Sequence, residues 1–422
     1  MSQQQFASDN PPVIIGIDWA DREHVVCLLD GRTPKLQVLV QDPAAIAEWL
    51  DELRKKFPQQ KILVAIEQSR GALVHALQAA PELEIYPINP KQLARYREAI
   101  DPSGRKNDLR DAELLAQFLL NHQQDLRAWK PDDELTRKIG HLSQMRRKLV
   151  DDRKRLQLRL NSILKLYFPL PLTLFKQSLI SKFILALLKR WPSLDALKIT
   201  HPKILRRFFA DHRIGNEDQQ TQWIDDIRKA TPLTRDPALV ETHALLVQCL
   251  ARQIAELNRA VHEFEESLRQ AVAQHPDQAL FRAIPGAGDA LVPRLIVAFG
   301  TDRDRYQSAE EIQSQSGIAP ITKRSGQSWS VFQRFFCPTF LKQTFHEFAD
   351  QARKFSQWSK AFYDLKRDQG MKHQAAVRAL AFKWIRVLFR LWKSKLTYSE
   401  ATYINQLRTT NSPLITFLPK MT

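Results

Sequence analysis

The fold is decided by the stretch Val13-Ile14-Ile15-Gly16-Ile17-Asp18, an apolar run that ends on a carboxylate. A second run, Ile62-Leu63-Val64-Ala65-Ile66, leads in the same way to Glu67. Short runs rich in β-branched residues predict buried strands. An acid at the end of such a strand is costly to bury unless it is paired or binds a metal. The two runs therefore predict a sheet that places carboxylates at the ends of two strands.

Other patterns predict the rest of an N-terminal domain over residues 13–130. We expect further strands at 24–30, 35–41 and 84–88, and helices at 43–56, 71–79, 91–99 and 108–121. The first three strands leave no room for helices between them, whereas strands and helices alternate afterwards. This order predicts a mixed α/β sheet with a leading antiparallel meander and later parallel crossovers. Residues 1–12 are polar, include two prolines and are expected to be disordered.

The middle of the chain, 131–275, carries no strand pattern. Long helical patterns cover 134–166 and 238–273, and the second has apolar residues close to a 3–4 spacing. Two such helices predict an antiparallel coiled coil, with a plain helical bundle core as the alternative. Between them, 167–235 is apolar, basic and broken by prolines, so we expect a small helical insertion there.

A third, mostly helical domain is expected over 276–398, followed by a tail at 399–422. It opens with Ile284-Pro285-Gly286-Ala287-Gly288. Two glycines one residue apart let backbone N–H groups approach a phosphate closely, as in a helix-hairpin-helix contact with DNA. A packing corner between two helices is the other interpretation of this turn.

A later stretch, 371–395, alternates basic and aromatic residues at helical spacing. Its cations include Lys383, Arg386 and Arg390. Such a helix buries its aromatic face and presents its basic face to a nucleic-acid backbone, or the basic face is simply solvated.

The charge of the 422-residue chain points to a polyanionic partner. Its net charge is +17, and residues 137–210 hold 18 basic against 3 acidic residues, while residues 321–422 hold 18 against 5. Two basic blocks in an otherwise acidic chain are typical of nucleic-acid binding, although solvated helix faces would show the same pattern. No run of about 18 apolar residues predicts a membrane span, and no N-terminal pattern predicts a secretory signal.

Cysteine usage indicates a reducing compartment. Cys27, Cys249 and Cys337 are far apart and form no CxxC pair, which argues against structural zinc and against a disulfide framework. We therefore expect a cytoplasmic protein, associated with the nucleoid when active.

Two more carboxylates stand in Lys106-Asn107-Asp108-Leu109-Arg110-Asp111-Ala112. Asp108 and Asp111 are three residues apart, so both can project from one face of a helical turn. Each alone has a simpler explanation, since Asp108 suits an N-cap and Asp111 suits the first turn of a helix. Neither explanation covers Asp18 and Glu67.

Taken together, the four acids predict a metal site. Two-metal phosphoryl transfer needs carboxylates on rigid, converging elements. Mg²⁺ prefers such oxygen ligands, and Mn²⁺ can take its place. Arg105 and Lys106, in the flexible stretch before Asp108, are expected to touch the backbone of a nucleic-acid substrate.

Several motifs in this order resemble a known family. The acids resemble the DEDD set of an RNase H-like, RuvC-like domain, and the whole chain resembles the DEDD insertion-sequence transposases of the IS110 family, relatives of the pilin-gene invertases. The resemblance covers about 13–130 and 276–395. Besides the stretches quoted above, it includes Ile88-Asn89-Pro90, Ser316-Gly317-Ile318-Ala319-Pro320 and Ser325-Gly326. The long span between the matched regions, including 167–235, departs from the family pattern.

The resemblance implies a site and a reaction. It implies that the four acids bind Mg²⁺ and that Ser325 attacks DNA, with strand cleavage through a 5′-phosphoserine linkage and rejoining to another end. Lys323 and Arg324 would then hold the scissile phosphate. From the residues alone Ser325 is an ordinary loop hydroxyl, with Ser328 and Ser330 as rivals.

The resemblance also implies partners. These are donor and target DNA, a homodimer or homotetramer in which the serine completes the acidic site of a partner subunit, and, for some members, a structured guide RNA. Two other classes stay open: a RuvC-like nuclease that uses metal-activated water instead of Ser325, and a non-enzymatic nucleic-acid scaffold.

Overall fold

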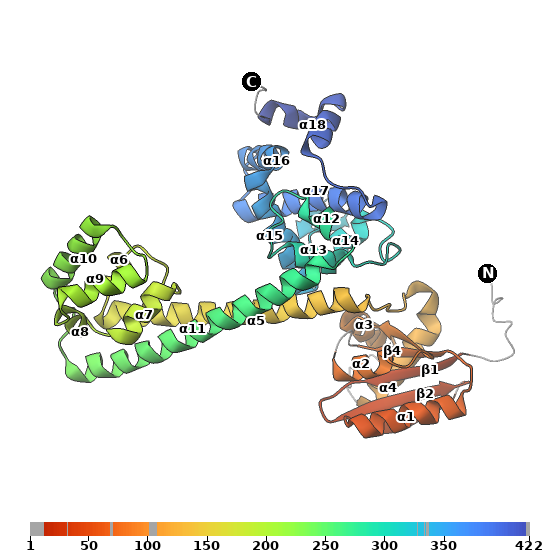
Figure 1. The fold of residues 1–422 in the computed structure, drawn as a ribbon. Coiled ribbons are helices and arrows are strands. Elements are labelled where there is room, and N and C mark those ends of the chain that lie inside the picture. Colours follow the sequence, from red (N-terminus) through yellow and green to blue (C-terminus); the bar gives the residue numbers. More distant parts are fainter. Residues whose placement is uncertain are drawn as a thin grey trace. The chain divides into compact units, whose positions relative to one another are not determined.

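The computed structural model describes residues 12–31, 33–67, 71–100, 108–326, 328–332, 334 and 337–418. The chain divides into two compact units, residues 1–131 and 132–422 (Figure 1). Residues 1–11 of the stretch expected to be disordered lie outside the described residues. Among the residues that are described, no helix is both long and apolar enough to cross a membrane.

The N-terminal unit is built on a five-stranded mixed sheet. Its strands lie in the order β3-β2-β1-β4-β5, and they are β1 (Val13–Asp18), β2 (Glu23–Asp30), β3 (Thr33–Val40), β4 (Ile62–Ile66) and β5 (Leu83–Pro87). β1, β2 and β3 form an antiparallel meander, and β4 and β5 extend the sheet parallel to β1. The mixed sheet and its leading meander confirm the expectation from the sequence.

Helices cover both faces of this sheet. α1 (Pro43–Lys56) and α2 (Ala72–Gln78) pack on one face, and α3 (Pro90–Ile100) and α4 (Asp108–His122) pack on the other. A short 3-10 turn (Gln123–Asp125) follows α4. Because successive strand residues point to opposite faces, alternate residues of β1 enter the two separate cores.

The C-terminal unit contains an arm made of two long helices, α5 (Glu134–Tyr167) and α11 (Pro237–Ala273). They run antiparallel, because Arg146 pairs with Glu265 and Arg153 donates to Asn258, so that residue numbers rise along one helix as they fall along the other. Between 144 and 159, α5 has no fully buried residue. In the middle of the arm, α5 and α11 thus pair with each other outside the two fully buried cores.

Two separate cores occupy the ends of the arm. The expected insertion is a cluster of five helices, α6 (Leu170–Thr173), α7 (Lys182–Arg190), α8 (Leu194–Lys198), α9 (Pro202–Asp211) and α10 (Glu217–Lys229). They share a hydrophobic core with the end of α5 and the start of α11 (Figure 1).

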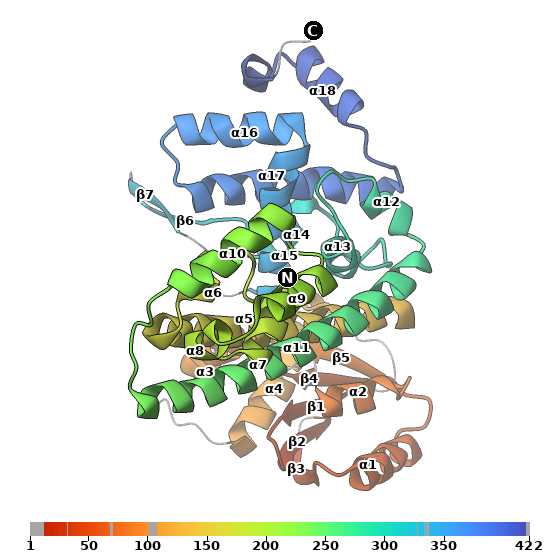
Figure 2. The ribbon, with the colours of Figure 1, turned by 60° about the vertical axis from the view of Figure 1, so that its left-hand side comes forward.

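The other core joins the start of α5 and the end of α11 to the C-terminal helices (Figure 2). These are α12 (Gln278–Arg282), α13 (Val292–Phe299), α14 (Ala309–Gln315), α15 (Thr339–Phe355), α16 (Gln357–Asp368), α17 (His373–Ser394) and α18 (Glu400–Thr409), then a 3-10 turn (Pro413–Phe417). A two-stranded hairpin, β6 (Ile321–Ser325) and β7 (Ser328–Phe332), lies between α14 and α15 in sequence. In the expected tail, residues 400–409 and 413–417 are helical, and Leu407 and Leu414 enter this core.

Candidate functional site

The first two acids emerge side by side from the sheet. β1 and β4 are parallel neighbours, and Ile17 is the register partner of Ile66, so Asp18 and Glu67 follow the same rung of the ladder. Neighbouring strands lie about 4.8 Å apart. Ile17 and Ile66 enter the core under α1 and α2, so the alternation of the strands places Asp18 and Glu67 on the opposite face, where α3 and α4 pack. Both acids are half-buried.

A glycine brings α4 onto this face. A Cβ built on Gly16 would stand 2.0 Å from the carbonyl oxygen of Ala112 and 2.6 Å from the amide nitrogen of Ala116. The backbone of α4 therefore crosses β1 at van der Waals contact, two residues before Asp18. Asp111 directly precedes Ala112, so the close approach carries the third acid to the face that holds the other two.

Asp111 is held by an arginine that the sequence analysis did not single out. Arg97 of α3 places Nη2 2.8 Å from Asp111 Oδ1, and the two side chains are 18% and 5% exposed. The approach is an ion pair without hydrogen-bond alignment, since Asp111 Oδ1 accepts no hydrogen bond from the described residues and Arg97 Nε donates none to them. A buried carboxylate oxygen with unused acceptor capacity is suited to a further cation.

The donor chemistry of the face suits a hard divalent cation. Asp18, Glu67 and Asp111 offer only carboxylate oxygens. Asp108 begins α4, and its side chain lies outside the described atoms, as do residues Arg105 and Lys106 as a whole. Within the described set, no three His, Cys, Asp or Glu side chains come close enough together to hold a metal. Asp108, the fourth acid, is thus the one whose side chain lies outside the described atoms.

Ser325 ends β6 at the tip of the hairpin. It is the register partner of Ser328, so two residues of the sequence, beginning with Gly326, separate the strands. Gly326 has a φ of 58°, in the left-handed region that such turns require. Arg324, which is exposed, donates from Nε to the carbonyl oxygen of Gly326 at 3.3 Å and braces the turn.

None of the hairpin side chains that the structure describes belongs to a hydrophobic core. The side chains of Lys323 and Ser325 lie outside the described atoms, whereas the two rival serines, Ser328 and Ser330, are exposed. Val331 and Phe332 are 55% and 49% exposed. An isolated two-stranded hairpin is marginally stable in water, so this one is suited to ordering by a partner.

The two glycines of the turn between α12 and α13 have different roles. Gly286 has a φ of 82°, and a Cβ there would meet the backbone of Ala352 in α15 at 2.8 Å, so this glycine serves packing. A Cβ on Gly288 would meet nothing within 4 Å. Only the Gly288 half of the turn is therefore open to a ligand.

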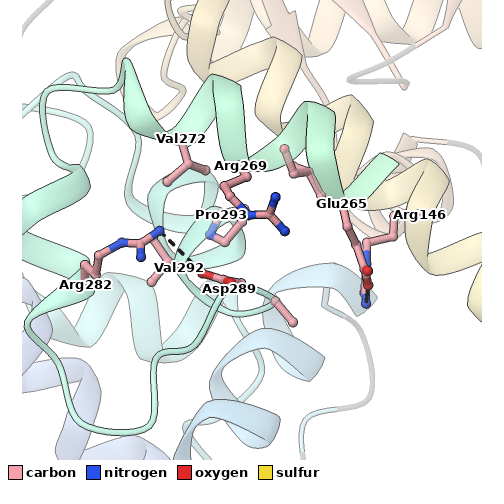
Figure 3. A pocket seen from close by; sticks show the side chains of 10 residues that line it. Arg146, Glu265, Arg269, Val272, Arg282, Asp289, Val292 and Pro293 are labelled. Atoms are coloured by element: carbon pink, nitrogen blue, oxygen red, sulfur yellow. Dashed lines mark hydrogen bonds and ion pairs between the residues drawn. The ribbon is translucent and has the colours of Figure 1, made fainter. Parts of the chain in front are cut away.

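A groove of about 940 Å³ runs along this turn. A smaller pocket of about 200 Å³ adjoins it, between the turn and the end of α11, and Figure 3 shows Arg146, Arg269 and Arg282 around it. Arg282 pairs with Asp289 across the pocket at 3.4 Å. The open side of the turn thus faces a concave surface rich in arginine.

Carboxylates hold the deeper arginines of the groove in place. Arg147 and Arg294 both pair with Glu347, at 3.0 Å and 2.5 Å, and Arg294 also donates to Thr344. Burial raises the pKa of Glu347, but the hydrogen bond from Arg294 and the charges of both arginines outweigh it and hold the pKa below its ordinary value. The groove is therefore preorganised, with a modest net positive charge.

The cations expected on one helix lie in two environments. Lys383 of α17 is half-buried, with Nζ 5.6 Å from the ring centre of Trp358. Arg386 and Arg390 are exposed, and Arg386 pairs with Glu310 at 2.8 Å. α17 thus presents two cations to solvent and holds the third against aromatic rings.

Sequence reasoning passed over Gly16 and Arg97. A lone glycine in a strand pattern is a signal of close backbone approach, so the contact at Gly16 could have been predicted from the sequence. Arg97 carries no such signal, because its pairing with Asp111 depends on how α3 packs beside α4.

Two family models match the chain. One, a DEDD transposase domain of IS110 type described as "Transposase", matches residues 15–169. The other, described as "Transposase IS116/IS110/IS902 family", matches residues 278–364. The first match spans the four acids, and the second spans the glycine turn and the hairpin with Ser325. A DEDD domain suggests a divalent metal.

Relatives match over nearly the whole chain. A protein described as a transposase for the mini-circle IS117 of Streptomyces coelicolor is 28% identical, over 93% of this chain and 96% of its own length. A 44.8 kDa protein of the insertion element IS116 of Streptomyces clavuligerus is 24% identical, over 93% and 97%. A 42 kDa protein of IS900 from Mycobacterium paratuberculosis is 23% identical, over 93% and 98%.

Proposed function

Since this chain belongs to the IS116/IS110/IS902 family of transposases, we propose that it cleaves DNA and rejoins the ends through a serine nucleophile beside a divalent metal. As a transposase it is an enzyme that acts on DNA. The proposal gives the N-terminal unit an RNase H-like, RuvC-like fold. The mixed five-stranded sheet with helices on both faces supports this fold.

The proposal depends on one observation: Asp18 and Glu67 directly follow the register partners Ile17 and Ile66, at the sheet face that α4 covers. The metal would be Mg²⁺, with Mn²⁺ as a substitute, and its ligands would be Asp18, Glu67, Asp108 and Asp111. When bound, it supplies positive charge beside the oxygens of a scissile phosphate. Arg97 pairs with Asp111 and orients it, and Gly16 lets α4 bring that carboxylate to the strand ends.

In the proposed cleavage step, the Ser325 Oγ attacks the phosphorus of one DNA phosphodiester. The bond from phosphorus to the 3′ oxygen breaks, the 3′ oxygen leaves as a hydroxyl with the proton that Ser325 loses, and a 5′-phosphoserine remains. Rejoining reverses these steps with the 3′ hydroxyl of another end. A position at the tip of an exposed hairpin suits a nucleophile that must reach a phosphate of the DNA backbone.

Contacts to the DNA backbone would come from several basic or glycine-containing segments. Arg105 and Lys106 precede Asp108 in sequence, Lys323 and Arg324 directly precede Ser325, and Gly288 lies open beside the arginine groove. Gly286 contributes by shaping the turn. The cations of α17, Lys383, Arg386 and Arg390, extend the basic surface.

The proposed partners are donor and target DNA, further copies of the chain and a structured guide RNA. Assembly into a homodimer or homotetramer would let Ser325 of one copy act with the acids of another. The two basic blocks motivate the RNA. Sequencing the nucleic acid that copurifies with active protein, made beside its native flanking DNA, tests this point. One discrete RNA supports a guide, and its absence from active protein contradicts one.

The site itself is tested with Glu67→Gln and Ser325→Ala, with Ser330→Ala as the matched serine control on the same hairpin. We expect the first two to abolish strand cleavage in Mg²⁺ while DNA binding persists, and the control to cleave at the wild-type rate. Full cleavage by Ser325→Ala would favour a nuclease that uses water. Full recombination by Glu67→Gln would contradict the metal site.

A further inference from the structure

Two lysines of the C-terminal unit meet over one aromatic ring. Lys366 of α16 places its Nζ 5.6 Å from the ring centre of Phe362, and Lys383 of α17 places its Nζ 5.1 Å from the same ring. Both lysines are half-buried. The two ammonium groups therefore share one aromatic neighbour at the junction of α16 and α17, close enough that the charge of Lys366 lowers the pKa of Lys383.

Within the described part of the chain, no carboxylate pairs with either lysine. Among the described ion pairs, neither lysine has a carboxylate oxygen within 4.0 Å, whereas neighbouring Lys360 pairs with Asp364 at 2.7 Å. Burial, and after it the charge of Lys366, lower the pKa of Lys383. Aromatic faces attract each cation but do not relieve the repulsion between the two. The site thus holds two like charges, and burial already makes the charge of Lys383 costly.

The remaining donor capacity of the pair suits an anion with several oxygens. Lys366 donates to Gln369 Oε1 at 2.9 Å, and an ammonium has three N–H groups, so donors remain on both lysines. We propose that Lys366 and Lys383 form a phosphate site for a nucleic-acid backbone, in which one phosphate bridges the two ammonium groups. This inference rests on the proposed action of the chain on DNA.

The arrangement of α17 favours a backbone phosphate over a free one. Arg386 and Arg390 follow Lys383 at i+3 and i+7, so the three cations lie along one side of the helix, and the two arginines are exposed. The separation from Lys383 to Arg390 is about 10 Å at 1.5 Å per residue. A nucleic-acid strand can contact this row of cations with successive phosphates, whereas a free phosphate contacts only the two lysines.

The test measures duplex DNA affinity across a sodium chloride series, without divalent metal so that cleavage does not interfere. Lys366→Met and Lys383→Met keep the apolar stems and remove the charges. We expect each to weaken binding roughly tenfold at fixed salt, the effect of one hydrogen bond to a charged group. The slope of log affinity against log salt should fall by about 0.9. The double variant should lose little more, because both lysines hold one phosphate.

Two control variants show whether a loss of DNA affinity is specific to the lysine pair. Lys360→Met removes an exposed, paired charge from the same helix and should bind like the wild type, and Lys383→Arg should retain the affinity that Lys383→Met loses. Slopes for Lys366→Met and Lys383→Met equal to that of Lys360→Met would overturn the site. A lowered melting temperature of Lys383→Met with unchanged DNA affinity would show a structural lysine and overturn it too.

Chemical acylation of Lys383 separates the two sources of phosphate. Protection by duplex DNA supports the proposal, and protection by inorganic phosphate but not by DNA identifies a small-anion site and overturns it. If the wild type cleaves DNA while the lysine variants bind normally, only this inference fails. If the lysine variants lose affinity but the wild type never cleaves, the proposed function fails and this site stands.

Discussion

The carbonyl oxygen of Ala112 lies 2.0 Å from the point where a Cβ on Gly16 would stand. This contact joins the strand that carries Asp18 to the helix that carries Asp111. A backbone oxygen cannot turn aside as the end of a flexible side chain can. The geometry of the acidic face therefore depends on the lack of a side chain at residue 16.

Gly16→Ala should separate α4 from β1. Overpacking of a core costs about 1–3 kcal/mol, and a backbone clash lies at the upper end of that range. We expect chemical denaturation to show a loss of about 3 kcal/mol and cleavage to fall with it. Gly288→Ala, at a position with open space, is the control and should unfold like the wild type. Equal stability of both variants would mean that α4 does not rest on Gly16.

Arg97→Leu should leave the Asp111 carboxylate buried without its cation. Leaving a buried charged group unpaired costs about 1–3 kcal/mol or more, so the melting temperature without divalent metal should fall. If Asp111 binds Mg²⁺, added Mg²⁺ should raise the melting temperature of this variant more than that of the wild type. An equal effect of Mg²⁺ on the two proteins would argue that Asp111 serves only the ion pair.

The paired glycines of the α12–α13 turn predict opposite outcomes. Gly286→Ala places a Cβ 2.8 Å from the Ala352 backbone at a φ of 82°, so it should destabilise the C-terminal unit by more than about 1 kcal/mol. Gly288→Val should leave the melting temperature unchanged and weaken DNA binding, because its side chain enters the open groove. If Gly288→Val binds DNA as tightly as the wild type, the turn serves only packing and does not contact DNA.

A buried histidine predicts how stability changes with pH. His275 accepts from the amide of Asp277 and lies 3.0 Å from Thr136 Oγ1, whose hydroxyl donates to Asp133. Burial lowers the pKa of His275 below its ordinary 6.5. The unfolded chain therefore takes up the proton first, and stability present above pH 6.5 is lost as pH falls through the folded-state pKa.

Thermal unfolding between pH 7.5 and 5.5 measures this effect. The melting temperature of the wild type should fall with pH, and the fall should be smaller in His275→Gln, which does not titrate. Part of the slope should remain, because burial also lowers the pKa of His346. A slope identical in the two proteins would show that His275 does not contribute to it.

Much of the N-terminal unit could be predicted because its signals are local. Apolar runs of five or six residues and the spacing between them determine strands, and the close succession of the first three leaves only a meander. The pairing of α5 with α11 was expected from two long helical patterns of similar length, the second of which carries an apolar stripe. The helix at 400–409 was not predicted, because its isolated Leu407 gains meaning only from the core that it enters.

The site could be predicted only in part. Asp18 and Glu67 stand out because a strand end makes a carboxylate unusual, but Ser325 has no local signal and depends on family resemblance. The partners of the cations were beyond reach: Arg97 with Asp111, Arg147 with Glu347, and Lys383 with two aromatic rings all join residues far apart in sequence or on separate helices.

The proposed function depends most on a covalent bond between Ser325 and DNA. The most direct measurement is peptide mass spectrometry of wild-type protein quenched during cleavage of a DNA substrate in Mg²⁺. We expect a nucleotide attached through its 5′ phosphate to Ser325 in the wild type, and no such adduct in Ser325→Ala or in Glu67→Gln. Cleaved DNA with free 5′ phosphates and no adduct, or an adduct on Ser328 or Ser330, would contradict it.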